Sequence, residues 1–157
     1  MATSPSLRRK MILATSAVDV SIPLNTPSLL RRLGGLLYDG LTLVALWLLA
    51  SAVFTSLYGA ADTASARLLL QAFSLTMIAT YFLWCWTHGG QTLAMKSWRM
   101  RVVHADGTPL TGLGASLRFL LALAGISAGG IGLCWALLDR DGQFLHDRLA
   151  KTRLIQD

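Results

Sequence analysis

Two long stretches of apolar, almost uncharged residues constrain the fold of this chain more than any other feature. The first runs from Leu33 to Tyr58 with Asp39 as its only charged residue, and the second runs from Leu68 to Thr87 without any charge. About 20 apolar residues in a helix suffice to cross the roughly 30 Å hydrocarbon core of a bilayer. Charged residues make up 14% of the 157 residues, whereas soluble domains carry roughly 25%. We therefore predict an all-α membrane protein with two transmembrane helices surrounded by membrane lipids.

The residues outside these stretches define the remaining organisation. Residues 1–28 are rich in Ser, Thr and Pro, which predicts a flexible N-terminal tail, and residues 29–157 form the transmembrane domain. The formal net charge of +6 does not indicate nucleic-acid binding, because the basic residues flank the apolar stretches instead of gathering on one cationic element. We expect no nucleic-acid partner.

A third apolar segment, from Phe119 to Leu138, contains four glycines within eight residues, Gly125, Gly129, Gly130 and Gly132. Three structures fit it: one spanning helix, a helix that packs closely through Gly125 and Gly129, or two half-helices that enter and leave the bilayer on one side. Such a re-entrant hairpin is tolerated where protein covers its backbone. We favour the hairpin and keep the third spanning helix as the alternative.

The distribution of basic residues favours the hairpin. Cytoplasmic segments of membrane proteins carry an excess of Lys and Arg. We therefore expect this chain in a bacterial inner membrane, with its N-terminus on the cytoplasmic side. A full crossing by the third segment would leave the basic residues that follow it outside. A hairpin keeps them, and the C-terminus, in the cytoplasm. These residues are Arg140, Arg148, Lys151 and Arg153.

The stretch between the second and third segments shows a strand-like pattern. Trp98, Met100 and Val102 alternate with Arg99 and Arg101, the period of two that a strand with one apolar face would have. Asp106-Gly107 follows and is typical of a turn. We interpret this as a short hairpin at the membrane surface, with an irregular loop as the alternative.

Arg32 and Asp39 are the main candidates for a functional site. Seven residues make about two helical turns, so both side chains lie on one helix face with Gly35 between them. An ionised carboxylate within the membrane needs a partner or water, so Asp39 should face the protein interior or a wet cavity. The alternative is a buried structural pair that fixes helix register. If the third segment is a hairpin, Asp147 returns to the same membrane face and can reach Arg32 or a neighbour.

Three motifs together resemble the RDD family of membrane proteins, which is named for one arginine and two aspartates. Arg32-x-x-Gly35-x-x-x-Asp39 resembles the family's first helix, residues 90–96 resemble its G-x-T-x-G-K stretch, and residues 135–152 resemble its closing aspartate motif around Asp147. Ala94 stands where the family usually has glycine. The resemblance covers roughly residues 28–155 and implies transport of an unidentified ligand or cation/proton exchange.

We therefore predict an ion or ligand site formed by Arg32, Asp39 and Asp147. Other residues are expected to support it: Gly35, Lys96, Arg118, His146 and Arg148. The three histidines are scattered along the chain, so we expect no metal and no cofactor. Two spans and a hairpin are too few to enclose a pathway, so transport of a small ligand or cation requires a homo-oligomer. The alternative function is a non-catalytic membrane scaffold or assembly partner; an enzyme is not expected.

Overall fold

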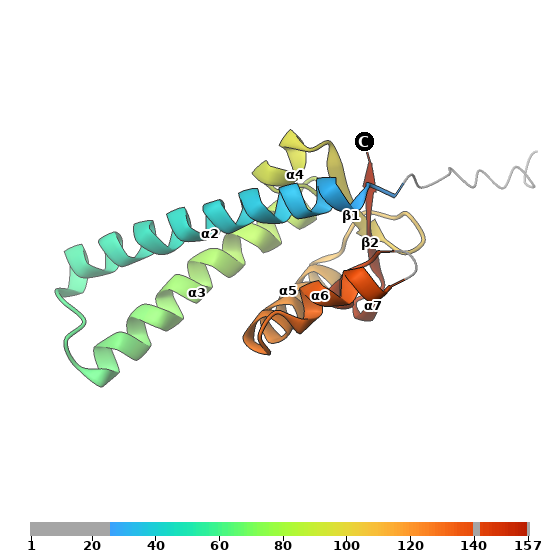
Figure 1. Ribbon diagram of the computed structural model, residues 1–157. Helices are drawn as coiled ribbons and strands as arrows, with labels where there is room; N and C mark the ends of the chain where they lie inside the picture. The colour runs from blue at the N-terminus through green and yellow to red at the C-terminus, as the bar shows by residue number, and fades with distance from the viewer. Residues whose placement is uncertain (1–25, 140–141, 157) are drawn as a thin grey trace, which may run out of the picture.

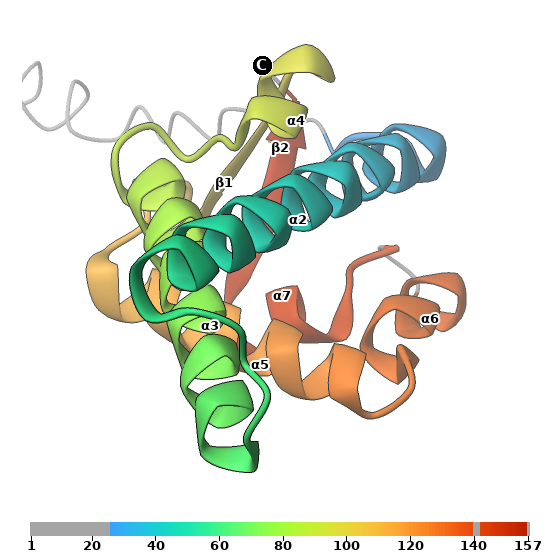
Figure 2. The ribbon, with the colours of Figure 1, turned by 90° about the vertical axis from the view of Figure 1, so that its left-hand side faces the viewer.

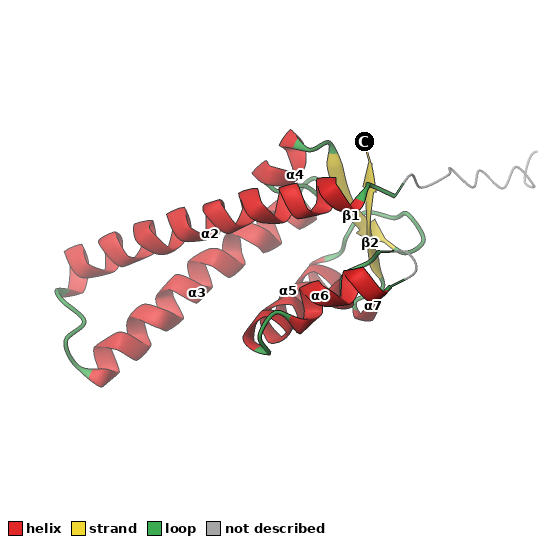
Figure 3. Cartoon of the chain, viewed as in Figure 1, coloured by secondary structure: helices red, strands yellow, loops and turns green. Residues whose placement is uncertain are grey.

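The computed structural model describes residues 26–139 and 142–156, and within these ranges the protein is built mainly from helices (Figures 1 and 3). The predicted flexible tail, residues 1–28, lies almost entirely outside the described residues. In chain order the elements are α2 (Leu29–Tyr58), α3 (Ala64–Thr87), α4 (Leu93–Ser97), β1 (Met100–His104), α5 (Gly112–Ser127), α6 (Ile131–Leu138), α7 (Leu145–Leu149) and β2 (Thr152–Gln156).

Helices α2 and α3 form a hairpin, and each is long enough to cross a bilayer. They have 30 and 24 residues, which correspond to about 45 and 36 Å. The chain turns at Gly59, which has a positive φ of 83°, and the Thr63 hydroxyl begins α3 by accepting a hydrogen bond from the N–H of Ala66. Large apolar side chains such as Leu48 and Leu69 are exposed on the outside. The prediction of two apolar helices of membrane-spanning length is confirmed.

The third apolar segment is a helical hairpin. Helix α5 begins at Gly112, earlier than predicted, because the Thr111 hydroxyl accepts a hydrogen bond from Gly114 N–H and caps it. Gly129 and Gly130, with φ of 78° and 80°, separate α5 from α6. These left-handed conformations favour glycine and end the helix. The arms have 16 and 8 residues, about 24 and 12 Å, so the predicted break into two shorter helices is confirmed.

The two arms are held together by a contact between backbones. A Cβ atom built on Gly125 would lie 3.2 Å from the Cα of Gly132, and a Cβ on Gly132 would lie equally close to the Cα of Gly125. Larger residues at either position would force the arms apart. The glycines therefore serve two purposes, since two of them form the bend and two allow the arms to touch.

Strand β1 has the predicted alternation but an unexpected partner. Met100 and Val102 are buried while Arg101 is exposed, as the period of two indicated. The strand pairs in antiparallel fashion with β2, near the C-terminus, in a register that places Val102 opposite Leu154. The prediction of a purely local hairpin is thus corrected, because the ladder joins two segments far apart in the sequence.

The predicted turn at Asp106-Gly107 is nevertheless present. Gly107 has a positive φ of 86° and its N–H donates a hydrogen bond to the His104 carbonyl at 2.9 Å. The returning chain makes a single bridge between Val103 and Pro109. Proline has no N–H to donate to a ladder, so the local pairing stops there and β1 pairs with β2 instead. We call the two-stranded sheet of β1 and β2 the ribbon.

The segments that form the ribbon repeat each other. Each consists of a glycine with positive φ, a short helix, a basic residue in the left-handed region and a five-residue strand. Every residue of the first segment is separated from its counterpart in the second by the same number of positions in the sequence. Arg99 and Lys151 both have φ of 51°. Counterpart residues are Gly90 and Gly142, Leu93 and Leu145, Arg99 and Lys151, and Val102 and Leu154. Since Val102 and Leu154 also face each other in the ladder, a local two-fold axis passes through this pair.

Each repeated segment follows a helical hairpin, α2–α3 in the first half of the chain and α5–α6 in the second. Both hairpins extend from the same side of the β1–β2 ribbon, as the two views of Figures 1 and 2 show. The first helix of each hairpin packs on the short helix of its own half, α2 on α4 and α5 on α7. The protein is therefore two unequal versions of one arrangement, and the second has the shorter hairpin.

Candidate functional site

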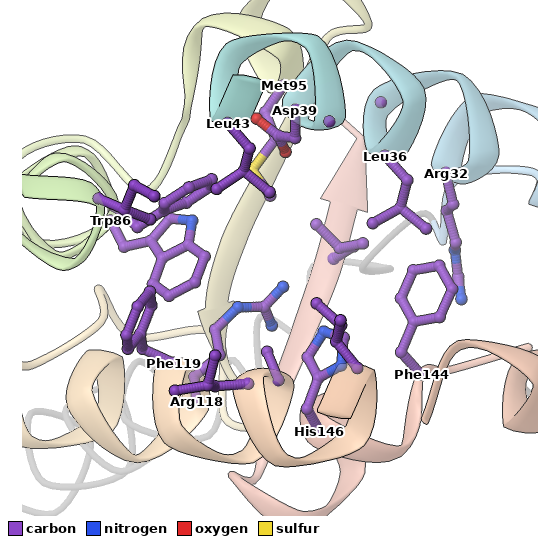
Figure 4. Close-up of a pocket in the computed structure, with 18 of the residues that line it drawn as sticks. Arg32, Leu36, Asp39, Leu43, Trp86, Met95, Arg118, Phe119, Phe144 and His146 are labelled. Carbon is purple, nitrogen blue, oxygen red and sulfur yellow. The ribbon is translucent and has the colours of Figure 1, made fainter. Parts of the chain in front are cut away.

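A cavity of about 420 Å³ lies between α2, α3, α5 and the ribbon (Figure 4). Most of its wall is apolar and aromatic, but four side chains that can carry charge also line it: Arg32, Asp39, Arg118 and His146. Asp39 projects into the cavity from α2 and Arg118 projects from α5 on the opposite wall. The two charged walls thus come from the corresponding helices of the two halves.

The spacing of Arg32, Gly35 and Asp39 places all three on the buried face of α2, as predicted. At Gly35, α2 lies close to the ribbon, since a Cβ atom built there would lie 2.6 Å from the methyl carbon at the flexible end of the Met100 side chain. This close approach brings Asp39 against the start of α4. The Thr92 side chain there lies beside the Asp39 carboxyl group.

Arg32 connects the two halves through main-chain carbonyls. Its Nε donates a hydrogen bond to the Pro27 carbonyl at 3.0 Å, and its Nη1 donates to the carbonyl of Gly142. Gly142 lies between α6 and α7, so this side chain fastens the beginning of the first hairpin to the end of the second. Its position at the head of α2 makes both bonds possible.

The ion-pair partner of Asp147 is Arg118, where the sequence had suggested Arg32 or a neighbour. Arg118 is 3% exposed and Asp147 is 1% exposed, so the pair is removed from solvent. Thr152 completes it, because its hydroxyl accepts a hydrogen bond from Arg118 Nη1 at 3.1 Å and donates one to Asp147 Oδ1 at 3.3 Å. The guanidinium carbon also lies 4.9 Å from the ring centre of Trp86, a cation–π geometry. Arg118, which we expected only to support the site, is its central residue.

The other predicted supporting residues lie in different places. His146 lines the cavity, whereas Lys96 is exposed on α4 and Arg148 is exposed and pairs with Asp139. Sequence reasoning did not include Thr92 or Trp86 in the site. Trp86 lies near the end of α3, and its burial at 5% exposure follows from a contact with Arg118 of α5 that no local pattern reveals.

His146 is buried beside the ion pair, with its Nε2 3.8 Å from Asp147 Oδ1. Burial, and secondarily the positive charge of Arg118, lower the pKa of His146 from 6.5 to about 3. Its ring stacks on Phe144 with the ring centres 5.5 Å apart and the planes 9° from parallel. Among residues 26–139 and 142–156, no group of three His, Cys, Asp or Glu side chains is arranged to hold a metal ion.

The model of the RDD family matches residues 26–151 of this chain. The chain belongs to the RDD family. Searches of curated proteins and of solved structures found no match. Since RDD proteins are membrane proteins, α2 and α3 are assigned as membrane helices. The sequence analysis assigned Arg32, Asp39 and Asp147 to the family's arginine and two aspartates by resemblance. Arg32 and Asp39 line the cavity, and Asp147 pairs with Arg118, which also lines it.

Breaking the buried ion pair should destabilise this RDD protein strongly. Arg118→Met or Asp147→Leu alone leaves one buried charge without its partner, which typically costs about 3–5 kcal/mol. We expect each variant to lower the free energy of unfolding in detergent by that order, and the double variant to recover part of the loss. Lys96→Met, on the exposed face of α4, is the control and should change little. Single variants as stable as wild type would show that the pair is not a buried ion pair.

The neutral His146 should make the protein less stable in acid. Below pH 6.5 the histidine takes up a proton in the unfolded chain, whereas in the folded protein it does so only near its lowered pKa of about 3. Its contribution is therefore complete above pH 6.5 and is lost as the pH falls toward 3, by at most about 1.4 kcal/mol per pH unit. His146→Gln should flatten this part of the curve of unfolding free energy against pH. An unchanged slope in the variant would contradict a buried neutral histidine.

Proposed function

We propose that this RDD protein is a component of a membrane transport system, with Asp39 as the acid that takes up and releases a proton or cation as a ligand is exchanged. The observation that carries the proposal is the position of Asp39 in a membrane helix, 8% exposed, on the wall of the cavity and facing Arg118. Acids within membrane helices are energetically costly and typically occur at ion or substrate pathways.

The balance of charge supports exchange at Asp39. Arg118 is paired directly with Asp147 and also interacts electrostatically with Asp39. Because Arg118 pairs directly with Asp147 and not with Asp39, it compensates the charge of the Asp39 carboxylate only in part. An incompletely compensated carboxylate is unfavourable in a region of low dielectric constant, and a proton or another cation bound at Asp39 would remove that cost. Asp147, held by Arg118 and Thr152, would stay ionised throughout.

The proposal includes an oligomer and an orientation. Two spanning helices and one short hairpin cannot enclose a pathway across the bilayer, so we expect a homo-oligomer. The basic residues of α4, β1 and β2 gather at the ribbon end of the molecule. At the other end, residues 59–67, which comprise the link between α2 and α3 and the first turn of α3, carry only Asp62 and Arg67 as charged residues. By the positive-inside tendency, the ribbon and both termini would lie on the cytoplasmic side of a bacterial inner membrane. Nothing in the proposal requires enzymatic activity.

A non-catalytic scaffold or assembly partner is the second candidate. The buried Arg118–Asp147 pair favours it, because a pair sealed by Thr152 and Trp86 would also suit a purely structural lock between helices. In that case Asp39 would only help to fix the position of α2. The two candidates differ in what substitution of Asp39 does to ion movement across a bilayer.

A flux assay in proteoliposomes tests the transport proposal. Wild-type protein should move protons, followed by an internal pH dye, when gradients of sodium, potassium or an organic cation are applied in turn. Asp39→Asn keeps the size of the side chain but removes the titrating group, so we expect the rate to fall by about tenfold or more, the effect of a barrier increase of roughly 1.4 kcal/mol. Asp62→Asn, in the exposed link, is the matched control and should retain the rate.

Two results would decide against transport. Absence of proton movement across the whole panel would favour the scaffold. Equal rates for wild type and Asp39→Asn would show that any flux does not pass through this acid. A wild-type mass in mild detergent corresponding to a monomer would also remove the oligomer on which the proposal depends.

A further inference from the structure

Three buried polar atoms around the cavity have no hydrogen-bond partner among the described residues. They are Oδ1 of Asp39, Nε1 of Trp86 and Nε of Arg118. The first is an acceptor and the other two are donors. All three residues line the cavity, and they come from α2, α3 and α5, the three helices that surround it. A buried polar group left unpaired typically costs about 1–3 kcal/mol, so their gathering around one space indicates an occupant that supplies the missing bonds.

The remainder of the cavity is suited to a hydrocarbon chain. Beyond the polar atoms its wall consists of side chains such as Leu43, Ile78, Phe82 and Leu123. Its edge includes Leu75 and Ile126, which are 41% and 53% exposed, on helices placed in the membrane. An opening lined in this way faces lipid. Water could bind near the polar atoms, but apolar space of this kind stays dry.

The charges around the polar end restrict the head of this occupant. An anionic head would meet the carboxylate of Asp39, and a cationic head would meet the guanidinium groups of Arg32 and Arg118. An uncharged head avoids both repulsions. It must donate a hydrogen bond to Asp39 Oδ1 and accept from Trp86 Nε1 or Arg118 Nε, and a hydroxyl group does both.

We propose that the cavity binds an uncharged, hydroxyl-bearing, long-chain amphiphile drawn from the bilayer, with its head between Asp39 and Arg118 and its chain along α3 and α5. The volume of about 420 Å³ lies within the range of roughly 300–1,000 Å³ common for small-molecule sites. The inference names the class of ligand for the proposed function, and it rests on that function because both treat the cavity as the ligand site.

Native mass spectrometry of the protein in mild detergent tests the proposal with three probes of similar chain type. These are 1-monoolein, with an uncharged glycerol head, oleate, with an anionic head, and oleyltrimethylammonium, with a cationic head. Wild-type protein should retain one monoolein, with oleate and the ammonium compound binding about tenfold more weakly or less, a difference of roughly 1.4 kcal/mol. Equal retention of all three, or retention of none, would overturn the proposal.

Two variants on the same helix locate the site. Ala122→Phe places a ring inside the cavity, since Ala122 lines it, and should abolish monoolein retention. Leu120→Phe makes a similar change at a residue of α5 that is 60% exposed, and should leave retention unchanged. If both variants bind monoolein as wild type does, the lipid lies elsewhere; if both lose it, retention does not depend on the cavity. Either result contradicts the proposal.

Asp39→Asn then tests the basis of the head selectivity. The amide still offers an oxygen to a hydroxyl, so monoolein should bind within about threefold of wild type, while removal of the negative charge should strengthen oleate binding by about tenfold. An unchanged ratio of monoolein to oleate binding would contradict the placement of the head beside Asp39.

The measurement of lipid binding is independent of the measurement of ion flux. Monoolein binding without ion movement would remove the proposed transport function, and flux without monoolein binding would remove only the ligand class.

Discussion

The buried ion pair between Arg118 and Asp147 is the interaction on which the rest of the structure depends. Arg118 belongs to α5, Asp147 belongs to α7, and Thr152, which bonds to both, begins β2. The pair therefore fixes the second hairpin and the C-terminal strand to each other. Because β2 is the partner of β1, it also holds the second hairpin beneath the first, and the cavity is the space left between them. Removal of one charge would affect all of these contacts at once.

The repeated design explains why the opposed charges lie where they do. In each half a helical hairpin leads through a glycine of positive φ to a short helix, a left-handed basic residue and a strand. The two strands meet at Val102 and Leu154, so the first helices of the two hairpins face each other across the local axis. Asp39 on α2 and Arg118 on α5 then occupy opposite walls. The second hairpin is shorter than the first, and the edge of the cavity is left with exposed apolar side chains, Leu75 and Ile126.

The sequence predicted the features that depend on local chemistry. Uninterrupted apolar stretches indicated α2 and α3, clustered glycines indicated the bend between α5 and α6, and the seven-residue spacing placed Arg32 and Asp39 on one face. It did not predict the β1–β2 ladder or the partner of Asp147, because pairing between distant segments leaves no local signature. Neither Trp86 nor Thr92 was predicted to belong to the site, because only tertiary packing brings these two residues to Arg118 and Asp39. The expected tail, residues 1–28, falls almost wholly outside the described residues.

We propose that both hairpins enter the bilayer from the face that carries the ribbon. The ribbon joins the two halves of the protein, and the cavity lies between these halves. Reporters fused after the last residue in bacterial cells test this proposal most directly. A fluorescent protein that folds only in the cytoplasm should fluoresce, and alkaline phosphatase, active only outside it, should be inactive at the same position. A reporter fused within the link between α2 and α3 should give the reverse result. Active phosphatase and no fluorescence at the C-terminus would mean that the third segment crosses the membrane, and would contradict the account.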